Sequence, residues 1–159
     1  MKIMGVDPSL NNTGFAVIDE NYTLLDSGVV KPAGSTLEDR LFEIFEKLTE
    51  KIKEWQPDYF VMEDTFYHRN PDTAIKLGAV KGVCLLAARR RGVNIITLSP
   101  TTVKLSITGD GRANKEKVAF MVNKILKLDV RFPSHISDAI ACAVAAVHKL
   151  RKDALFYKR

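Results

Sequence analysis

Three strand patterns follow one another at the start of the chain with no helical pattern between them, and this order restricts the fold more than any other feature. Residues 2–6 form an apolar run that stops around Asp7, because Pro8 cannot donate to a strand ladder. Residues 15–18 form a second strand after a polar turn, and residues 22–30 alternate as a returning antiparallel strand does. The sequence therefore predicts a three-stranded meander.

Helical and strand patterns alternate along the rest of the chain. A capping box at Ser35 and Glu38 predicts an amphipathic helix that ends before Pro57, and residues 59–62 form a short strand that ends in Glu63. The later elements are a helix from Asn70-Pro71 to about Arg91, a strand at 93–98, a short helix from Ser99-Pro100, a helix capped by Asn114, and a last helix from Pro133-Ser134. This order predicts one α/β domain at residues 1–150, a mixed five-stranded sheet with helices on both faces, and a basic tail at 151–159.

The chain has the size of a single domain. Its 159 residues are 46% hydrophobic, enough to bury about two-thirds of the surface of the unfolded chain. The 24 Lys and Arg residues against 19 Asp and Glu leave a net charge of +5, which favours a polyanionic partner such as nucleic acid. Cys84 and Cys142 stand in apolar helical surroundings, as the core thiols of a reduced protein do. With no apolar run suited to a signal peptide or a membrane span, we expect a cytoplasmic protein.

Acidic side chains end two of the predicted strands, at Asp7 and at Glu63. Asp7 on its own is also compatible with a simple turn cap. If the two strands are central and parallel, however, both acids reach the carboxyl edge of the sheet, where the ligands of open α/β sheets bind. A buried charge needs a partner or a metal ion, so this edge is the first candidate for a functional site.

The last helix offers two more metal-capable side chains in its first turn. His135 and Asp138 are three residues apart, which places both on one face. Taken singly, His135 is compatible with an exposed histidine, and Asp138 with a carboxylate that favours the helix dipole. Asp138 faces the apolar stretch 139–146, however, where an unpaired carboxylate would be costly. Together with Asp7 and Glu63, these side chains would form a donor set that suits Mg²⁺ or Mn²⁺.

Aromatic and basic side chains follow the Glu63 strand directly, at Phe66, Tyr67, His68 and Arg69. This mixture suits the unstacked bases of a nucleic acid, although Phe66 could equally pack in the core. Arg112 ends a loop at 108–112 that is basic at its end, and Lys115 follows near the start of a helix. The Lys115 ammonium group could bind a phosphate oxygen, or could simply be solvated. We therefore expect Phe66, Tyr67, Arg69, Arg112 and Lys115 to contact nucleic acid.

The helix that starts at Asn70 is apolar on more than one side. Gly78 and Gly82 lie four residues apart on it, a spacing that lets another backbone approach closely. That backbone could be a strand of this chain or a helix of a second copy. A helix buried on two faces suggests a homodimer.

The segments Gly5-Val6-Asp7-Pro8, 57–63 and 133–139, with Phe66, Asn70, Ala74, residues 76–78 and Gly82 between them, closely resemble the RuvC family of Holliday-junction resolvases. The resemblance covers nearly the whole chain in order. It implies a ribonuclease-H-like fold and a homodimer that nicks two strands of a four-way DNA junction symmetrically, in recombination and repair. It also implies two Mg²⁺ ions in each active site, with Mn²⁺ as a substitute, and a branch-migration motor complex as a candidate partner.

Residue roles follow from the same resemblance by position. Asp7, Glu63, His135 and Asp138 resemble the metal-binding catalytic set of the family. Lys104 and Lys115 are similar to its two active-site lysines, which implies that Lys104 contacts DNA as well. Phe66 resembles the aromatic residue that stacks on bases near the crossover.

Two positions depart from the pattern of the family. His135 stands where many members have aspartate, which removes a negative charge and favours Mn²⁺. Ser9 replaces the usual glycine after Asp-Pro and is similar to phage-type relatives, in which junction selectivity is looser. A phage-type branched-DNA nuclease and a junction-binding protein without catalysis are therefore the alternatives. An actin-like ATPase half has a comparable hairpin, but a 159-residue domain lacks the second lobe that would close over a nucleotide.

Overall fold

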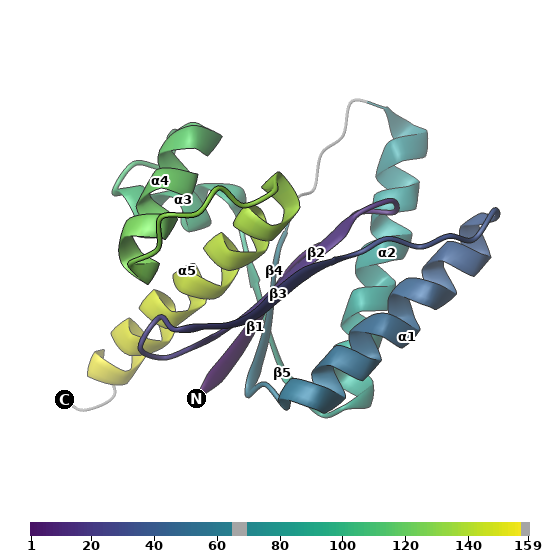
Figure 1. Ribbon diagram of the computed structural model, residues 1–159, viewed down its shortest axis with the longest axis horizontal. Helices are drawn as coiled ribbons and strands as arrows, with labels where there is room; N and C mark the ends of the chain where they lie inside the picture. The colour runs from purple at the N-terminus through teal and green to yellow at the C-terminus, as the bar shows by residue number, and fades with distance from the viewer. Residues whose placement is uncertain (65–69, 157–159) are drawn as a thin grey trace.

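A computed structural model describes residues 1–64 and 70–156 of the chain. The elements in chain order are β1 (Lys2–Asp7), β2 (Thr13–Asp19), β3 (Leu24–Val30), α1 (Leu37–Trp55), β4 (Tyr59–Glu63), α2 (Pro71–Arg90), β5 (Asn94–Leu98), α3 (Pro100–Thr108), α4 (Lys115–Leu126) and α5 (Ser134–Phe156). One five-stranded sheet in the order β3-β2-β1-β4-β5 separates α1 and α2 from α3, α4 and α5 (Figure 1). The predicted mixed sheet with helices on both faces is confirmed.

The register of the central strands brings the two strand-end acids together. β1 pairs antiparallel with β2 and parallel with β4, and Val6 lies opposite Met62. The next residue along each strand is Asp7 in β1 and Glu63 in β4. Both acids therefore reach the carboxyl edge of the sheet side by side, as the sequence predicted for parallel central strands.

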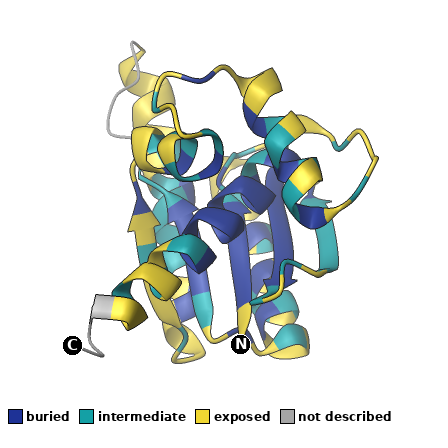
Figure 2. Cartoon of the chain, turned by 90° about the vertical axis from the view of Figure 1, so that its left-hand side faces the viewer, coloured by how far each residue is buried: buried dark blue, intermediate teal, exposed yellow. Residues whose placement is uncertain are grey.

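Helix α5 is the core element of the face that it covers. Residues 139–147 are all buried, and Figure 2 shows this helix crossing the strands with its middle part in dark blue. Gly5 on β1 permits the close approach, because a Cβ atom there would stand 2.0 Å from the carbonyl oxygen of Ala139. With its backbone resting directly on β1, α5 carries its first turn to the carboxyl edge of the sheet.

Side-chain caps start four of the helices. The predicted N-caps are confirmed at Asn70, Ser99 and Asn114. The predicted capping box at Ser35 is wrong by one residue. The Thr36 hydroxyl accepts a hydrogen bond from the Asp39 N–H, because the helix begins at Leu37 and the residue just before it is the cap.

Two element boundaries differ from the sequence prediction. β3 begins at Leu24 rather than at residue 22, since Tyr22 has a φ of 66° in the turn after β2. α5 continues to Phe156, so the separate tail expected from residue 151 is wrong as far as the described residues extend. The Arg151 guanidinium anchors this last part of the helix by donating to the Tyr22 hydroxyl at 3.2 Å.

The two cysteines are core residues. Cys84 and Cys142 are buried and free, and burial raises the pKa of the Cys84 thiol to about 12. The prediction of core thiols is confirmed. Among the helices of residues 1–64 and 70–156, none is both long and apolar enough to cross a membrane.

Candidate active site

A small cavity opens where β1 and β4 end. Its volume is about 230 Å³, and its charged lining consists of Asp7, Glu63, Lys104, Lys115 and Asp138. These side chains come from β1, β4, α3, α4 and α5. The fold therefore brings together five of the six residues that the sequence predicted to be catalytic.

His135, the sixth of these residues, lies in the first turn of α5 beside Asp7. Its Nδ1 atom and the Asp7 Oδ2 atom are 2.6 Å apart in a hydrogen bond between residues 128 positions apart in sequence. Gly14 allows this contact, because a Cβ atom there would stand 2.1 Å from the His135 carbonyl oxygen. The first turn of α5 thus rests on the start of β2, and this packing places the imidazole on Asp7.

The carboxylates of the cavity repel one another. Burial raises the pKa of Asp7, the hydrogen bond with His135 opposes the rise, and the charge of Asp138 adds to it. Burial also raises the pKa of Glu63, and the charges of Asp138 and Asp7 raise it further. A raised carboxyl pKa means that folding disfavours the ionised form, so a cation among these oxygens would be stabilising.

Two lysines bring positive charge to the same cavity. The Lys115 Nζ donates to Asp138 Oδ2 at 3.0 Å, and this hydrogen bond raises the pKa of Lys115. The Lys115 side chain is 74% exposed, so the ion pair contributes no more than about 1 kcal/mol. Lys115 can therefore leave Asp138 for a phosphate oxygen. The charge of Lys104 on α3 partly opposes the rise in the pKa of Glu63.

The loop between β1 and β2 is closed by Thr13, which the sequence analysis did not single out. The Thr13 hydroxyl donates to the Ser9 carbonyl oxygen at 2.6 Å and accepts from the Ser9 N–H at 3.2 Å. Thr13 is fully buried, so this pair of hydrogen bonds is shielded from water. The closure holds the loop against the end of β1, next to Asp7. A threonine between a polar turn and a strand was the available signal.

A second cavity of about 450 Å³ continues from the strand-end acids along α2, and Lys76 and Lys81 line it. The Lys81 Nζ lies 3.7 Å from Asp64 Oδ1, and its side chain is 13% exposed. The sequence analysis assigned neither lysine to the site. The four-residue spacing of Leu77 and Lys81 could have placed Lys81 on the helix face that borders the acids.

The structure does not test the other residues predicted to contact DNA. Phe66, Tyr67, His68 and Arg69 lie outside the described residues, so the DNA contacts predicted there stay predictions. Arg112 is exposed in the turn between α3 and α4, where its N–H donates to Asp110 Oδ1 at 2.9 Å. It does not line the cavity of about 230 Å³, and its predicted role in DNA binding stays a prediction.

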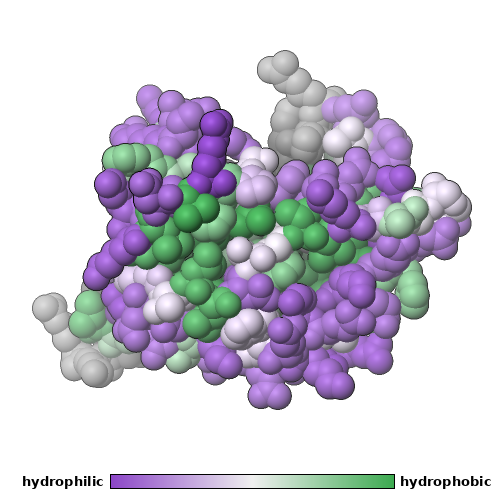
Figure 3. Space-filling model, viewed as in Figure 1, coloured by the Kyte–Doolittle hydropathy of each residue, from purple (hydrophilic) through white to green (hydrophobic). Residues whose placement is uncertain are grey.

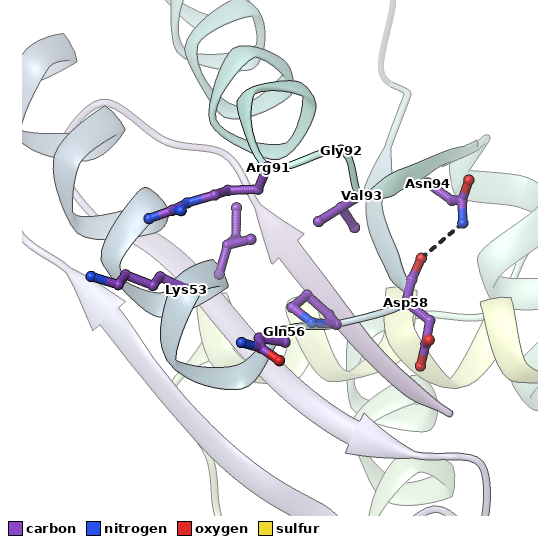
Figure 4. Close-up of a pocket in the computed structure, with 9 residues that line it drawn as sticks. Lys53, Gln56, Asp58, Arg91, Gly92, Val93 and Asn94 are labelled. Atoms are coloured by element: carbon purple, nitrogen blue, oxygen red, sulfur yellow. Dashed lines mark hydrogen bonds between the residues drawn. The ribbon is translucent and has the colours of Figure 1, made fainter.

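A further cavity of about 440 Å³ lies at the opposite edge of the sheet, where α1 and α2 end. Figure 4 shows Lys53 and Arg91 extending along one side of it, and Asn94 donating to the Asp58 carbonyl oxygen at 3.2 Å on the other. Basic side chains are favourable near helix C-termini, which accounts for their position here. The strand-end acids lie at the other edge, and we place the candidate active site there.

Known proteins are similar to this chain in sequence and in fold. The chain matches the family profile described as Crossover junction endodeoxyribonuclease RuvC over residues 3–148. The protein of that name from Shewanella sp. (strain W3-18-1) is 36% identical over 149 residues, which cover 92% of this chain and 86% of the relative. The protein of that name from Tolumonas auensis has the same identity and coverage.

Solved structures agree with the sequence relatives. The RuvC structure of Thermus thermophilus has a TM-score of 0.89 and 31% identity, and the alignment covers 96% of this chain and 97% of that one. The same protein in complex with a Holliday junction substrate has a TM-score of 0.91 and 31% identity, with 96% of each chain covered. The yeast mitochondrial Holliday junction resolvase Ydc2, at 14% identity and a TM-score of 0.69, shares the fold. This chain belongs to the crossover junction endodeoxyribonuclease RuvC family.

Proposed function

We propose that this chain is a structure-specific endonuclease that resolves four-way DNA junctions in recombination and repair by paired, symmetric nicks. The observation that carries the proposal is the meeting of Asp7, Glu63 and Asp138 in one lysine-lined cavity of a RuvC-family chain. The T. thermophilus RuvC with a similar fold was solved with a Holliday junction substrate. A net charge of +5 also suits a polyanionic substrate.

The donor set of the candidate site suits a divalent metal ion in its chemistry. In the described part of the chain, no three His, Cys, Asp or Glu side chains already form a ligand group. Instead, His135 bonds Asp7 and Lys115 bonds Asp138, so these two acids each have a nitrogen partner. The raised pKa values of Asp7 and Glu63 indicate that additional positive charge would be favourable. We infer that Asp7, Glu63, His135 and Asp138 hold Mg²⁺, with Mn²⁺ as a substitute.

The roles of the side chains follow from their positions. Two divalent ions held by this set would supply Lewis acidity for in-line attack by water and for departure of the 3′ oxygen. Asp7, on the central strand, lies between Glu63 on one side and His135 on the other. Lys115 leaves Asp138 and binds a phosphate oxygen as negative charge develops on it. The products would be a 5′-phosphate and a nick that a ligase can seal.

Cleavage of synthetic DNA in Mg²⁺ or Mn²⁺ tests the proposal. We expect paired nicks in four-way junctions and much slower cleavage of flaps and linear duplex. Comparable cleavage of all three substrates would instead indicate a phage-type branched-DNA nuclease, the alternative that Ser9 raises. Binding of junctions without nicking in either metal would indicate a junction-binding protein and would refute the enzymatic proposal.

Replacing the imidazole of the site by a carboxylate tests its role as a ligand. We expect His135→Asp to keep nicking activity and to raise the ratio of Mg²⁺-supported to Mn²⁺-supported rates about tenfold, because hard oxygen donors favour Mg²⁺. We also expect a larger rise in melting temperature on adding Mg²⁺ than in the wild type, since the added carboxylate increases repulsion around Asp7. His148→Gln is the control, because His148 is a half-buried histidine of α5 that hydrogen-bonds Ser106 on α3 rather than an acid of the site. Complete loss of activity in His135→Asp would argue against the imidazole as a ligand.

Helix α2 supports a homodimer as part of the proposal. A Cβ atom at Gly78 or Gly82 would meet no atom of the described chain within 4 Å. The sequence analysis offered a strand of this chain or a helix of a second copy as the neighbour of these glycines, and no strand of the described chain packs there. Ile75 and Leu86, on the same helix face, are 72% and 62% exposed. A second copy would bury this face and place two active sites in one particle, as paired nicks require.

A charge on this face should separate the two copies. We expect Leu86→Glu to raise the dimer dissociation constant about a hundredfold, because an unpaired carboxylate would be buried in the interface. Sedimentation velocity measures the change. Phe42→Glu is the matched control, since Phe42 is 65% exposed on α1 and lies outside the proposed interface. A wild type that is monomeric at all concentrations, or equal effects of the two variants, would contradict the interface.

A branch-migration motor complex and a cytoplasmic location complete the proposal. The resemblance to the family supports the first, and the reduced, buried thiols support the second. Retention of a junction-bound motor on immobilised protein would test the partner, and an empty pull-down at equal junction occupancy would refute it.

A further inference from the structure

A groove lies beside the candidate active site, between α4 and the segment that leads into α5. Its volume is about 820 Å³. The Asn123 side chain on α4 donates to the Val130 carbonyl oxygen at 2.8 Å, and the Leu128 N–H donates to the Asn123 carbonyl oxygen at 2.9 Å. These hydrogen bonds hold the far wall of the groove against α4.

The groove is continuous with the catalytic cluster. Lys115 and Asp138 line both the groove and the cavity that holds Glu63. Asp7 and Glu63 in turn line that cavity and the one along α2. Three hollows therefore form a row across the carboxyl edge of the sheet, with the acids in the middle. A DNA strand whose phosphate lies among the acids must continue in both directions, and the groove is the hollow on the α4 side.

The side chains of the groove suit bases better than phosphates. Phe120 on α4 is 59% exposed and Val130 is 49% exposed, and Figure 3 shows hydrophobic surface among hydrophilic side chains in the region of α4 and α5. Glu116 and Asp129 also line the groove and would repel a phosphate chain, while Arg131 supplies one positive charge. Exposed aromatic faces stack on unpaired bases without sequence preference. The Lys124 ammonium group lies over the Phe120 ring, 5.4 Å from its centroid, which leaves the other ring face for a base.

We propose that this groove holds the unstacked nucleotides next to the cleaved phosphate, with Phe120 as the stacking platform for a base. The proposal rests on the nuclease function proposed above and adds a specific contact to it. A base on the Phe120 ring face opposite Lys124 would hold the strand that leaves the acids on the α4 side, while Arg131 would lie beside its sugar-phosphate chain.

Fluorescence of an introduced tryptophan tests the contact directly. The chain has a single tryptophan, Trp55, at the end of α1. Its indole N–H donates to Asp26 on β3. In metal-free buffer, we expect Phe120→Trp to lose emission on addition of oligothymidylate or of a four-way junction, because a stacked base quenches indole. Phe42→Trp, at a similarly exposed phenylalanine of α1, should not respond. Equal responses of the two variants would overturn the proposal.

Binding affinity gives the second measurement. We expect Phe120→Ala to raise the junction dissociation constant about tenfold, as loss of a base-aromatic stack does, and Phe120→Tyr to restore it. Phe42→Ala should bind as the wild type does. If the wild type cuts junctions and Phe120→Ala binds them normally, the proposed base contact at Phe120 is refuted and the nuclease function is not affected. If the wild type cuts no DNA, oligothymidylate quenching still decides whether the groove binds bases. Melting curves confirm that the variants fold.

Discussion

Asp7→Asn should abolish junction nicking and leave junction binding intact. Removal of a ligand from the proposed metal site at the reacting phosphate should forfeit several kcal/mol of transition-state stabilisation, which corresponds to a fall in rate of about a thousandfold or more. Asparagine has the same shape and removes one of the charges that repel the phosphate. The dissociation constant for a junction should therefore stay within about threefold of the wild type, or fall. Single-turnover cleavage and a gel-shift titration in metal-free buffer measure the two quantities.

The change is informative because Asp7 has no structural need for its charge. Burial and the charge of Asp138 raise the pKa of its carboxyl group, so the ionised form is a cost to folding that function must offset. Asp58→Asn is the matched control, because Asp58 lies at the other end of β4 and accepts a hydrogen bond from the Lys2 N–H. It should nick at the wild-type rate. If Asp7→Asn lost junction binding together with its melting transition, Asp7 would be a structural residue.

The position of the two acids at strand ends could be predicted from the sequence because local patterns set it. Pro8 ends β1, and the apolar run at 59–62 ends in Glu63. Their proximity depended on the condition that both strands are central and parallel, which the sheet confirms. His135 and Asp138 could be placed on one helix face by their spacing, but spacing gives no orientation relative to β1. The hydrogen bond between His135 and Asp7 depends on how α5 crosses the sheet, which local patterns do not specify.

Other features of the fold and the site could not be predicted from local sequence patterns, for different physical reasons. Ser35 and Thr36 both carry a hydroxyl group that can cap a helix, so the sequence does not distinguish them. Thr36 is the cap because α1 begins at Leu37. Lys81 looks like any solvated helix lysine until α2 is packed beside β4. Phe120 lies outside the apolar face of α4. The groove that it lines is completed by the connection at 127–133, whose sequence has no periodic pattern. Long-range packing, rather than local preference, decides each of these cases.

Gly14→Ala should disable the site by moving α5. The new Cβ atom would stand 2.1 Å from the His135 carbonyl oxygen, a backbone atom that cannot rotate away. The first turn of α5 must shift by about 1 Å to relieve the contact, and it carries His135 and Asp138 with it. A displacement of that size at a reacting centre costs roughly a hundredfold in rate, and overpacking of this kind destabilises by about 1–3 kcal/mol. Nicking rates measured well below the melting temperature separate the two effects.

Gly28→Ala distinguishes displacement of α5 from general damage to the sheet. Gly28 lies on β3, opposite Phe15, and its added Cβ atom would meet the far end of the Phe15 ring at 2.9 Å. A ring can turn where a helix backbone cannot, so we expect a loss of stability of about 1 kcal/mol or less and normal nicking. If the two variants lost the same stability and the same activity, the effect of Gly14→Ala would lie in the sheet. A selective loss of activity in Gly14→Ala would instead mean that this glycine holds the imidazole and Asp138 against the strand-end acids.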